Sequence, residues 1–217
     1  MPRLVSAVLA RNEADRWLRP TLERLKAISD HVLLLDDGST DATSDIARDL
    51  GCEVVTRMGQ NPMWGEEAPA RAELWALGAE RAGDGWLLIA DADMILGGDP
   101  RPYCLSRTNT AWSFILYDLW DKSNYRADGF WQGHRHPRPW LFRPAALTEQ
   151  AVWPAKGLHT GHCPLNFPLL TANAESLHWI HLQYSTPESR KAKYDAYRRC
   201  AAQLTEFERA HAESILD

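Results

Sequence analysis

The first hundred residues alternate between short apolar runs and longer amphipathic stretches. The apolar runs are too short for buried helices and predict strands covered on both faces, at 4–10, 31–35, 52–56 and 85–90. Between these runs, apolar residues recur at helical spacing, most clearly over 17–28 and 68–81. Strand–helix units of this length indicate a parallel sheet with right-handed crossovers.

Capping residues separate these elements. We expect Asn12 to cap the first helix and Pro20 to interrupt it. Ser39 or Thr40 should cap the next helix, and Gly51 suits its C-terminal end.

The second half of the chain has a different texture. We expect strands at 110–118, 138–143 and 176–184, and an aromatic-rich loop at 119–137. A C-terminal helix should follow, with either Ser185 and Glu188 as a capping box or Thr186 as the cap and Pro187 in the first position. Tyr194 begins an apolar stripe along this helix.

The composition is that of an ordinary globular protein. The chain has 217 residues, 45% hydrophobic and 24% charged, and no repeat or linker divides it, so we expect one domain with parts at 1–95, 96–184 and 185–217. The net charge of −5 argues against a protein that coats nucleic acid with its whole surface. The lack of a membrane-length apolar run or signal peptide, and the scattered cysteines, predict a cytoplasmic protein with reduced thiols.

Polar clusters follow three of the expected strands, at 11–13, 36–39 and 91–93. The carboxyl ends of parallel strands meet at one edge of the sheet, where ligands bind. Asp91 and Asp93 lie two residues apart, so on an extended chain they point the same way and can share one hard cation. An acidic surface turn is the commoner meaning of such a pair alone, but three coincident polar strand ends favour a binding site.

These clusters, in this order and spacing, resemble the nucleotide-binding half of family-2 glycosyltransferases. The resemblance covers roughly the first 95 residues and rests on 7–13, 34–41 and 91–93. The segments 181–184 and 190–194 are similar to the histidine-containing strand and basic helix that close the site in bacterial members. The resemblance implies the GT-A fold: an α/β, Rossmann-like architecture with a mixed, mostly parallel central sheet flanked by helices.

The resemblance also implies a nucleotide-sugar donor, with uridine favoured, and a bound Mn²⁺ or Mg²⁺. It makes Asp93 the direct metal ligand, places Asp91 at the ribose or the metal, and makes His181 a further metal contact. Asp37 would accept a hydrogen bond from uracil. The residues implied for the nucleotide sugar are Ala10, Asn12, Glu13, Asp37, Arg71, Asp91 and Ala92. Arg71 could equally be a solvated helix residue, and Asn12 only a cap.

The catalytic base is where the sequence departs from the family. An inverting transfer needs a group that accepts the proton of the acceptor hydroxyl. Thr160 stands where a glutamate is expected, so His159 is our first candidate, with His162 and Asp128 as others. Asp118 and Asp121 are further possibilities from the loop, and a zinc site that includes the histidines has no recognised spacing.

The acceptor is expected to meet the loop around 119–143. Between Lys122 and Arg143, five basic residues face one aspartate, interleaved with aromatic rings. The rings proposed for the acceptor are Trp120, Tyr125, Trp131 and Trp140. A glycan, a protein, a lipid headgroup or modified DNA would each suit this surface, and a tryptophan-rich lid is the alternative.

The sequence therefore predicts a metal-dependent, inverting glycosyltransferase that moves one sugar to an acceptor hydroxyl. A sugar nucleotidyltransferase is the nearest alternative, although residues 10–13 lack the glycine-rich loop that holds a triphosphate. A non-catalytic module that binds a sugar nucleotide or a carbohydrate is the other alternative, because the base is not obvious.

Overall fold

A computed structural model describes residues 1–57, 67–155, 160–199, 202 and 204–217. The strands are β1 (Leu4–Ala10), β2 (His31–Asp36), β3 (Glu53–Thr56), β4 (Trp86–Asp91), β5 (Met94–Gly97), β6 (Ala111–Asp118), β7 (Arg138–Phe142) and β8 (Thr171–His181). The helices are α1 (Leu18–Ile28), α2 (Thr43–Asp49), α3 (Glu67–Ala82), α4 (Pro187–Arg199) and α5 (Glu206–Glu213), with 3₁₀ turns η1 (Tyr103–Leu105), η2 (Pro144–Ala146) and η4 (Ser214–Leu216).

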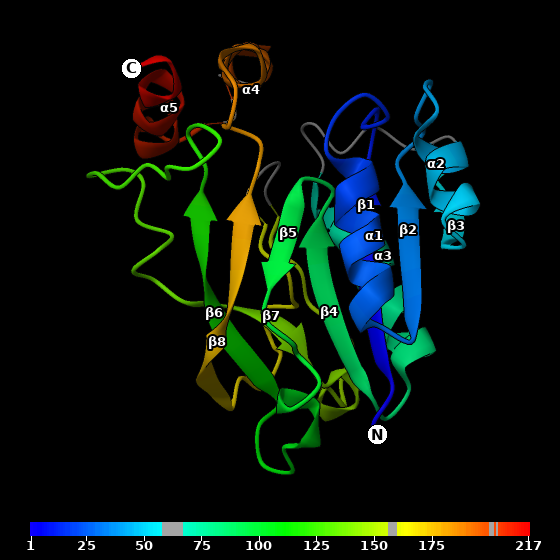
Figure 1. Ribbon diagram of the computed structural model, residues 1–217. Helices are drawn as coiled ribbons and strands as arrows, with labels where there is room; N and C mark the ends of the chain where they lie inside the picture. The colour runs from blue at the N-terminus through cyan, green and yellow to red at the C-terminus, as the bar shows by residue number, and fades with distance from the viewer. Residues whose placement is uncertain (58–66, 156–159, 200–201, 203) are drawn as a thin grey trace.

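These strands form one mixed sheet in the order β3-β2-β1-β4-β7-β6-β8-β5. The half built from β1 to β4 is parallel, as predicted. The other half joins it through an antiparallel pair between β4 and β7. Figure 1 shows β2, β4, β6 and β8 ending at the same upper edge, with the N-terminus at the opposite edge, and β1 runs parallel to β2 and β4. The expected α/β class with a mixed, mostly parallel sheet is confirmed.

Helices cover both faces of the parallel half. Along β1, Leu4 and Val8 pack with α1 in one hydrophobic cluster, whereas Val5 and Leu9 pack with α3 in another. This alternation follows from the two-residue period of a strand and explains why β1 is apolar throughout. Among the described residues, no helix is long and apolar enough to cross a membrane.

A third apolar cluster joins the C-terminal helices to the loop that follows β6. Trp131 of that loop packs with Tyr184, with Tyr197 of α4, and with Ile215 of η4. Its indole Nε1 donates a hydrogen bond to Ser214 Oγ at 3.1 Å. In Figure 1, α4 and α5 lie beyond the upper ends of β6 and β8. The end of the chain therefore fixes this loop at the same edge where the parallel strands end.

Several local predictions were wrong. α1 begins at Leu18, after a turn in which Asn12 has φ 54°, so Asn12 is no cap, and Pro20 lies inside the first turn without breaking it. α2 is preceded by Ala42, and the side chain of Asp41 accepts from the backbone N–H of Thr43, so neither Ser39 nor Thr40 caps it.

The C-terminal half also differs in detail from the prediction. β5, which follows β4 after only two residues, was missed, β8 begins at Thr171 and ends at His181, and the expected single C-terminal helix is two helices, α4 and α5. The Thr186 alternative for the start of α4 is confirmed, since Thr186 Oγ1 accepts from the backbone N–H of Ser189 at 3.1 Å.

The turn between β5 and η1 packs closely against β8, and a substitution there tests this packing. Gly98 has φ 85°, and a Cβ there would lie 2.2 Å from the carbonyl oxygen of Ser176. We expect Gly98→Ala to lower the free energy of unfolding by roughly 2–4 kcal/mol, because both the backbone conformation and the close approach become strained. Gly129→Ala is the matched control, since its Cβ would meet nothing within 4 Å, and urea denaturation measures both. Equal stability of the two variants would contradict the account.

Candidate active site

The loops after β1 and β2 are joined at the upper edge of the sheet by hydrogen bonds. The backbone N–H of Asn12 donates to Ser39 Oγ at 2.9 Å, and Asn12 Oδ1 accepts from the backbone N–H of Thr40 at 2.8 Å. The next residue, Glu13, donates its backbone N–H to Thr43 Oγ1 at 2.8 Å. The left-handed backbone at Asn12 thus serves to join the two polar strand ends, which is why an asparagine is suited to this position.

The second strand end contains buried charge. Asp37 is buried and forms ion pairs with Arg57 Nη1 and, at 3.7 Å, with Arg11 Nη1. Arg11 also donates to the backbone carbonyl of Asp37. Arg57 immediately follows β3, so it is a fourth polar strand end at the same edge. Two guanidinium groups therefore compensate the carboxylate that was predicted to bind a base.

The third strand end is held by Arg71 of α3. This buried guanidinium donates through Nε to Glu67 Oε1 at 2.9 Å and through Nη2 to Asp91 Oδ1 at 2.8 Å. Burial acts to raise the pKa of Asp91, but Arg71 and His162 outweigh it and hold that pKa well below its ordinary value. Arg71 is thus a buried bridge between two carboxylates and not a solvated helix residue.

The segment around Thr160 meets the same network. The backbone N–H of Thr160 donates to Glu67 Oε2 at 3.4 Å, and His162 Nε2 lies 3.7 Å from Asp91 Oδ2. Within the described residues, three buried side-chain atoms here make no hydrogen bond: Arg71 Nη1, Thr160 Oγ1 and His162 Nε2. Buried polar atoms without a hydrogen-bond partner are uncommon, because they destabilise a protein. Such atoms are typical of sites that receive a polar ligand.

Asp93, predicted as the metal ligand, faces His181 of β8. His181 Nε2 lies 3.4 Å from Asp93 Oδ2, and His181 Nδ1 lies 2.7 Å from Asp118 Oδ1 at the end of β6. Burial alone would lower the pKa of His181, but the two carboxylates raise it to about 10. The two residues that the resemblance paired are therefore in contact, although 88 positions separate them in the sequence.

Carboxylate and imidazole groups fit a divalent cation at this position. Asp93 supplies a hard oxygen, and His181, oriented through its other ring nitrogen by Asp118, supplies a nitrogen when the cation displaces the proton from Nε2. In the part of the chain that is described, no group of three or more His, Cys, Asp or Glu side chains could hold an ion by itself. This pattern suits a cation that keeps positions for phosphate oxygens, as Mg²⁺ does in phosphate-binding sites. Asp91 is engaged by Arg71 and is less available as a ligand.

The candidates for the catalytic base lie in different surroundings. His159 lies outside the described residues. His162 lies beside Asp91, which is hydrogen-bonded to Arg71. Its ring packs on Trp140, with ring centroids 4.1 Å apart. Burial lowers the pKa of His162, so its imidazole is neutral at neutral pH. Asp128 is held by Arg126 and by the backbone N–H of Phe130, with a lowered pKa, which makes it a poor proton acceptor.

Most of the rings predicted to meet the acceptor are structural. Trp131 and Trp140 are only 2% and 1% exposed, so neither offers a face for stacking. Trp120 is half-buried, with the guanidinium groups of Arg126 and Arg190 at 4.5 and 4.7 Å from its ring centre. Tyr125 is 44% exposed and is the one of the four that faces solvent. The other three rings pack against neighbouring aromatic side chains.

Sequence reasoning missed Arg57 and Glu67. Arg57 follows β3 directly, so the rule that polar strand ends converge would have found it. Glu67 precedes Arg71 by one helical turn, a spacing that brings the two side chains together. Ala10 and Ala92, two of the residues implied for the nucleotide sugar, are buried at the ends of β1 and β4.

Glu13 is a carboxyl group at this edge whose pKa is strongly raised. It is ion-paired with Arg16 at 3.0 Å, yet its Oε2 is buried and makes no hydrogen bond in the described structure. Burial, assisted by the nearby charges of Asp93 and Asp41 and opposed by Arg16, raises the pKa of Glu13 from 4.5 to about 7. Between these values the folded chain keeps a proton that the unfolded chain has lost, so folding stability must fall as pH rises through this window.

We therefore expect Glu13→Gln to remove a stability loss of up to about 3 kcal/mol between pH 5 and pH 8. Urea denaturation at the two pH values measures the free energy of unfolding of the variant and the wild type. Glu23→Gln, on the exposed surface of α1, is the control and should behave as the wild type does. The same pH dependence in wild type and Glu13→Gln would contradict the assignment.

Solved structures of glycosyltransferases share this fold. TarS of S. aureus is 15% identical, with a TM-score of 0.56, and the match covers 99% of this chain but 42% of TarS. Glucosyl-3-phosphoglycerate synthase from Mycobacterium tuberculosis, in complex with Mn²⁺, uridine diphosphate and glucosyl-3-phosphoglycerate, is 16% identical over 95% of this chain and 80% of that one, with a TM-score of 0.56. The mannosyltransferase PcManGT from Pyrobaculum calidifontis, in complex with GDP-Man and Mn²⁺, is 14% identical over 99% and 70%, with a TM-score of 0.54.

The sequence itself identifies the family. No curated protein sequence matches the chain. The profile described as Glycosyl transferase family 2 matches residues 7–163, which include the three polar strand ends and the segment with Thr160 and His162. This match covers well over half of the 217 residues and agrees with the GT-A architecture of the structural neighbours. The chain belongs to glycosyl transferase family 2 and is a glycosyltransferase.

Proposed function

We propose that this glycosyltransferase moves a single sugar from a uridine-diphosphate donor to a hydroxyl group of an acceptor, with inversion at the anomeric carbon. The observation that supports this best is the convergence of Asp37, Asp91 and Asp93 at one edge of the sheet, each with a basic partner. Family membership argues against the two alternatives raised from the sequence, a nucleotidyltransferase and a non-catalytic binding module.

Asp93 and His181 would hold the Mn²⁺ or Mg²⁺. Such an ion neutralises the diphosphate charge as the bond between sugar and phosphate breaks. Asp118 would orient His181 through the 2.7 Å contact to Nδ1. The Mn²⁺ bound in the structures of the mycobacterial synthase and the archaeal mannosyltransferase supports this proposal.

The uracil base of the donor would lie at the second polar strand end, after β2. Uracil presents an N–H donor between two carbonyl acceptors, and the Asp37 carboxylate beside the Arg11 guanidinium offers the complementary pattern. Asn12 and Glu13 border the same loops, with Ala10 and Ala92 below them. Arg71 would keep Asp91 ionised next to the ribose or the sugar.

We favour His162 as the catalytic base, the group that accepts the proton of the acceptor hydroxyl. In an inverting transfer the acceptor oxygen attacks the anomeric carbon, its proton passes to the base, and the nucleoside diphosphate departs. The neutral imidazole of His162 has an Nε2 that makes no hydrogen bond with the described residues and lies 3.7 Å from Asp91, so it can accept that proton beside the donor. Asp91 would then stabilise the imidazolium that forms. Of the rings that we expected to meet the acceptor, Tyr125 is the exposed one and is the candidate contact, whether the acceptor is a glycan, a protein, a lipid headgroup or modified DNA.

Nucleotide release from a panel of uridine, guanosine and thymidine diphosphate sugars tests the reaction class. We expect release from a uridine donor with Mn²⁺ and none with EDTA. Asp93→Ala should lower this release by about 100-fold or more, because several kcal/mol of charge stabilisation are lost. Asp49→Ala, on the exposed end of α2, is the control with the same change of charge. Metal-independent release, or full activity of a folded Asp93→Ala variant, would contradict the proposal. Release from a guanosine donor alone would change the assigned nucleobase from uracil to guanine.

Replacement of His162 tests the base. His162→Gln should lower kcat for transfer or donor hydrolysis by about 100-fold or more and leave the KM for donor within a few-fold, because proton acceptance and not binding is lost. His31→Gln changes a histidine at the start of β2, at the opposite end of that strand from the site, and should have no effect on kcat. Thermal unfolding of both variants checks that packing on Trp140 is preserved. If kcat of a folded His162→Gln variant stays within threefold of wild type, another group is the base.

A further inference from the structure

A cleft lies at the lower edge of the sheet, opposite the candidate active site. Its lining includes Trp86, the first residue of β4, whereas Asp91 is the last residue of that strand. Five residue steps in a strand span about 16 Å, so the two places are separate. The cleft has a volume of about 470 Å³, which is the size of a small-molecule site. The proposed glycosyl transfer does not use it.

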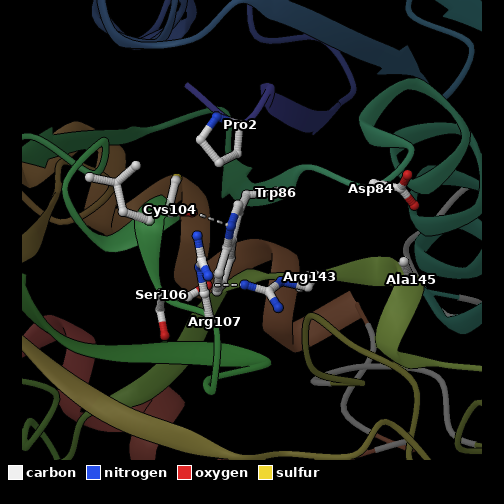
Figure 2. Close-up of a pocket in the computed structure, with 9 residues that line it drawn as sticks. Pro2, Asp84, Trp86, Cys104, Ser106, Arg107, Arg143 and Ala145 are labelled. Atoms are coloured by element: carbon white, nitrogen blue, oxygen red, sulfur yellow. Dashed lines mark hydrogen bonds between the residues drawn. The ribbon is translucent and has the colours of Figure 1, made fainter.

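The floor of the cleft holds one arginine in a fixed position. The Trp86 ring is buried, and its Nε1 donates to the backbone carbonyl of Cys104 at 2.8 Å. The Arg143 guanidinium packs over this ring at 4.9 Å from its centre and donates through Nη2 to the backbone carbonyl of Ser106. Figure 2 shows this bond beside the ring. Stacking and the hydrogen bond together restrict the guanidinium before any ligand arrives.

A second arginine lines the same cleft. Arg107 is exposed and, like Nε and Nη1 of Arg143, makes no hydrogen bond or ion pair with the residues that the structure describes. In Figure 2 both arginine side chains point toward the Trp86 ring, and the Asp84 carboxylate points away from them. Asp84 forms no ion pair with either arginine in the described structure, although it lines the cleft. Two guanidinium groups thus share one cleft in which, among the described residues, neither is paired with a carboxylate.

We propose that this cleft binds a phosphate group, as a phosphomonoester. Guanidinium forks match the oxygens of phosphate, and a phosphomonoester brings close to two negative charges for the two arginines, whereas a carboxylate brings one. Arg143 covers the Trp86 ring, so the cleft has no free aromatic face for a nucleobase. Leu105, 57% exposed, and Pro2 provide an apolar rim for the remainder of the ligand. The phosphate source is either a soluble ester or a lipid headgroup.

NMR titration of the ¹⁵N-labelled full chain with inorganic phosphate tests the proposal. The indole N–H resonance of Trp86 should shift and saturate. Arg107→Ala should weaken the binding at least about tenfold, the equivalent of one charge-assisted hydrogen bond. Arg209→Ala, which removes an exposed arginine of α5 outside the cleft, should bind as the wild type does. No saturable shift in the wild type, or equal affinity in Arg107→Ala, overturns the proposal, and the latter result places the phosphate elsewhere.

Cosedimentation with vesicles distinguishes the two sources. Vesicles of phosphatidylcholine with phosphatidic acid present a phosphomonoester headgroup, and phosphatidylcholine alone does not. Binding to the former that is lost in Arg107→Ala and kept in Arg209→Ala assigns the site to a lipid headgroup. Binding of inorganic phosphate without binding to vesicles assigns it to a soluble ester. If neither probe binds in a manner that depends on Arg107, the cleft is not a phosphate site.

Discussion

The candidate site depends on the buried guanidinium of Arg71. It joins Glu67 on its own helix to Asp91 at the end of β4, and thereby fixes α3 against the strand end. Glu67 in turn accepts from the backbone N–H of Thr160, so the segment with His162 is held at the same place. Removing one partner from such a network leaves a buried charge uncompensated, which typically destabilises a protein by roughly 3–5 kcal/mol. The geometry around Asp91 is therefore a property of the whole network and not of the acidic motif alone.

A topological constraint brings the network and the metal candidates together. Parallel pairing of β1, β2 and β4 places their carboxyl ends at one edge, and β6 and β8 end at that edge as well. His181 and Asp118 thus reach Asp93 from the second half of the chain, where the register pairs Asp118 with His181 directly. The C-terminal helices complete the arrangement, since Arg190 of α4 donates to the backbone carbonyls of Trp120 and Tyr184. The chemistry of the site is assembled from both halves.

Most of the parallel half of the sheet and the residues at its strand ends could be predicted from the sequence, because the patterns that specify them are local. Apolar runs fixed the strands β1, β2 and β4 to within a residue, and the rule for parallel sheets placed Asp91, Asp93 and Glu13 at one edge. Side-chain partners were harder to predict. Asn12 looks like a cap in sequence but adopts a left-handed turn that joins two loops, and Trp131 and Trp140 look like ligand-stacking rings but are buried. Those outcomes depend on tertiary packing, which no local pattern records.

The central claim is that Asp93 and His181 receive a divalent cation together with the donor diphosphate. A crystal structure of the full chain with Mn²⁺ and uridine diphosphate, with anomalous diffraction recorded at the manganese edge, tests it most directly. The account predicts one anomalous peak within coordination distance of both Asp93 and His181, with the uracil ring near Asp37. A peak at another place, or nucleotide bound with no manganese between these two side chains, would contradict it.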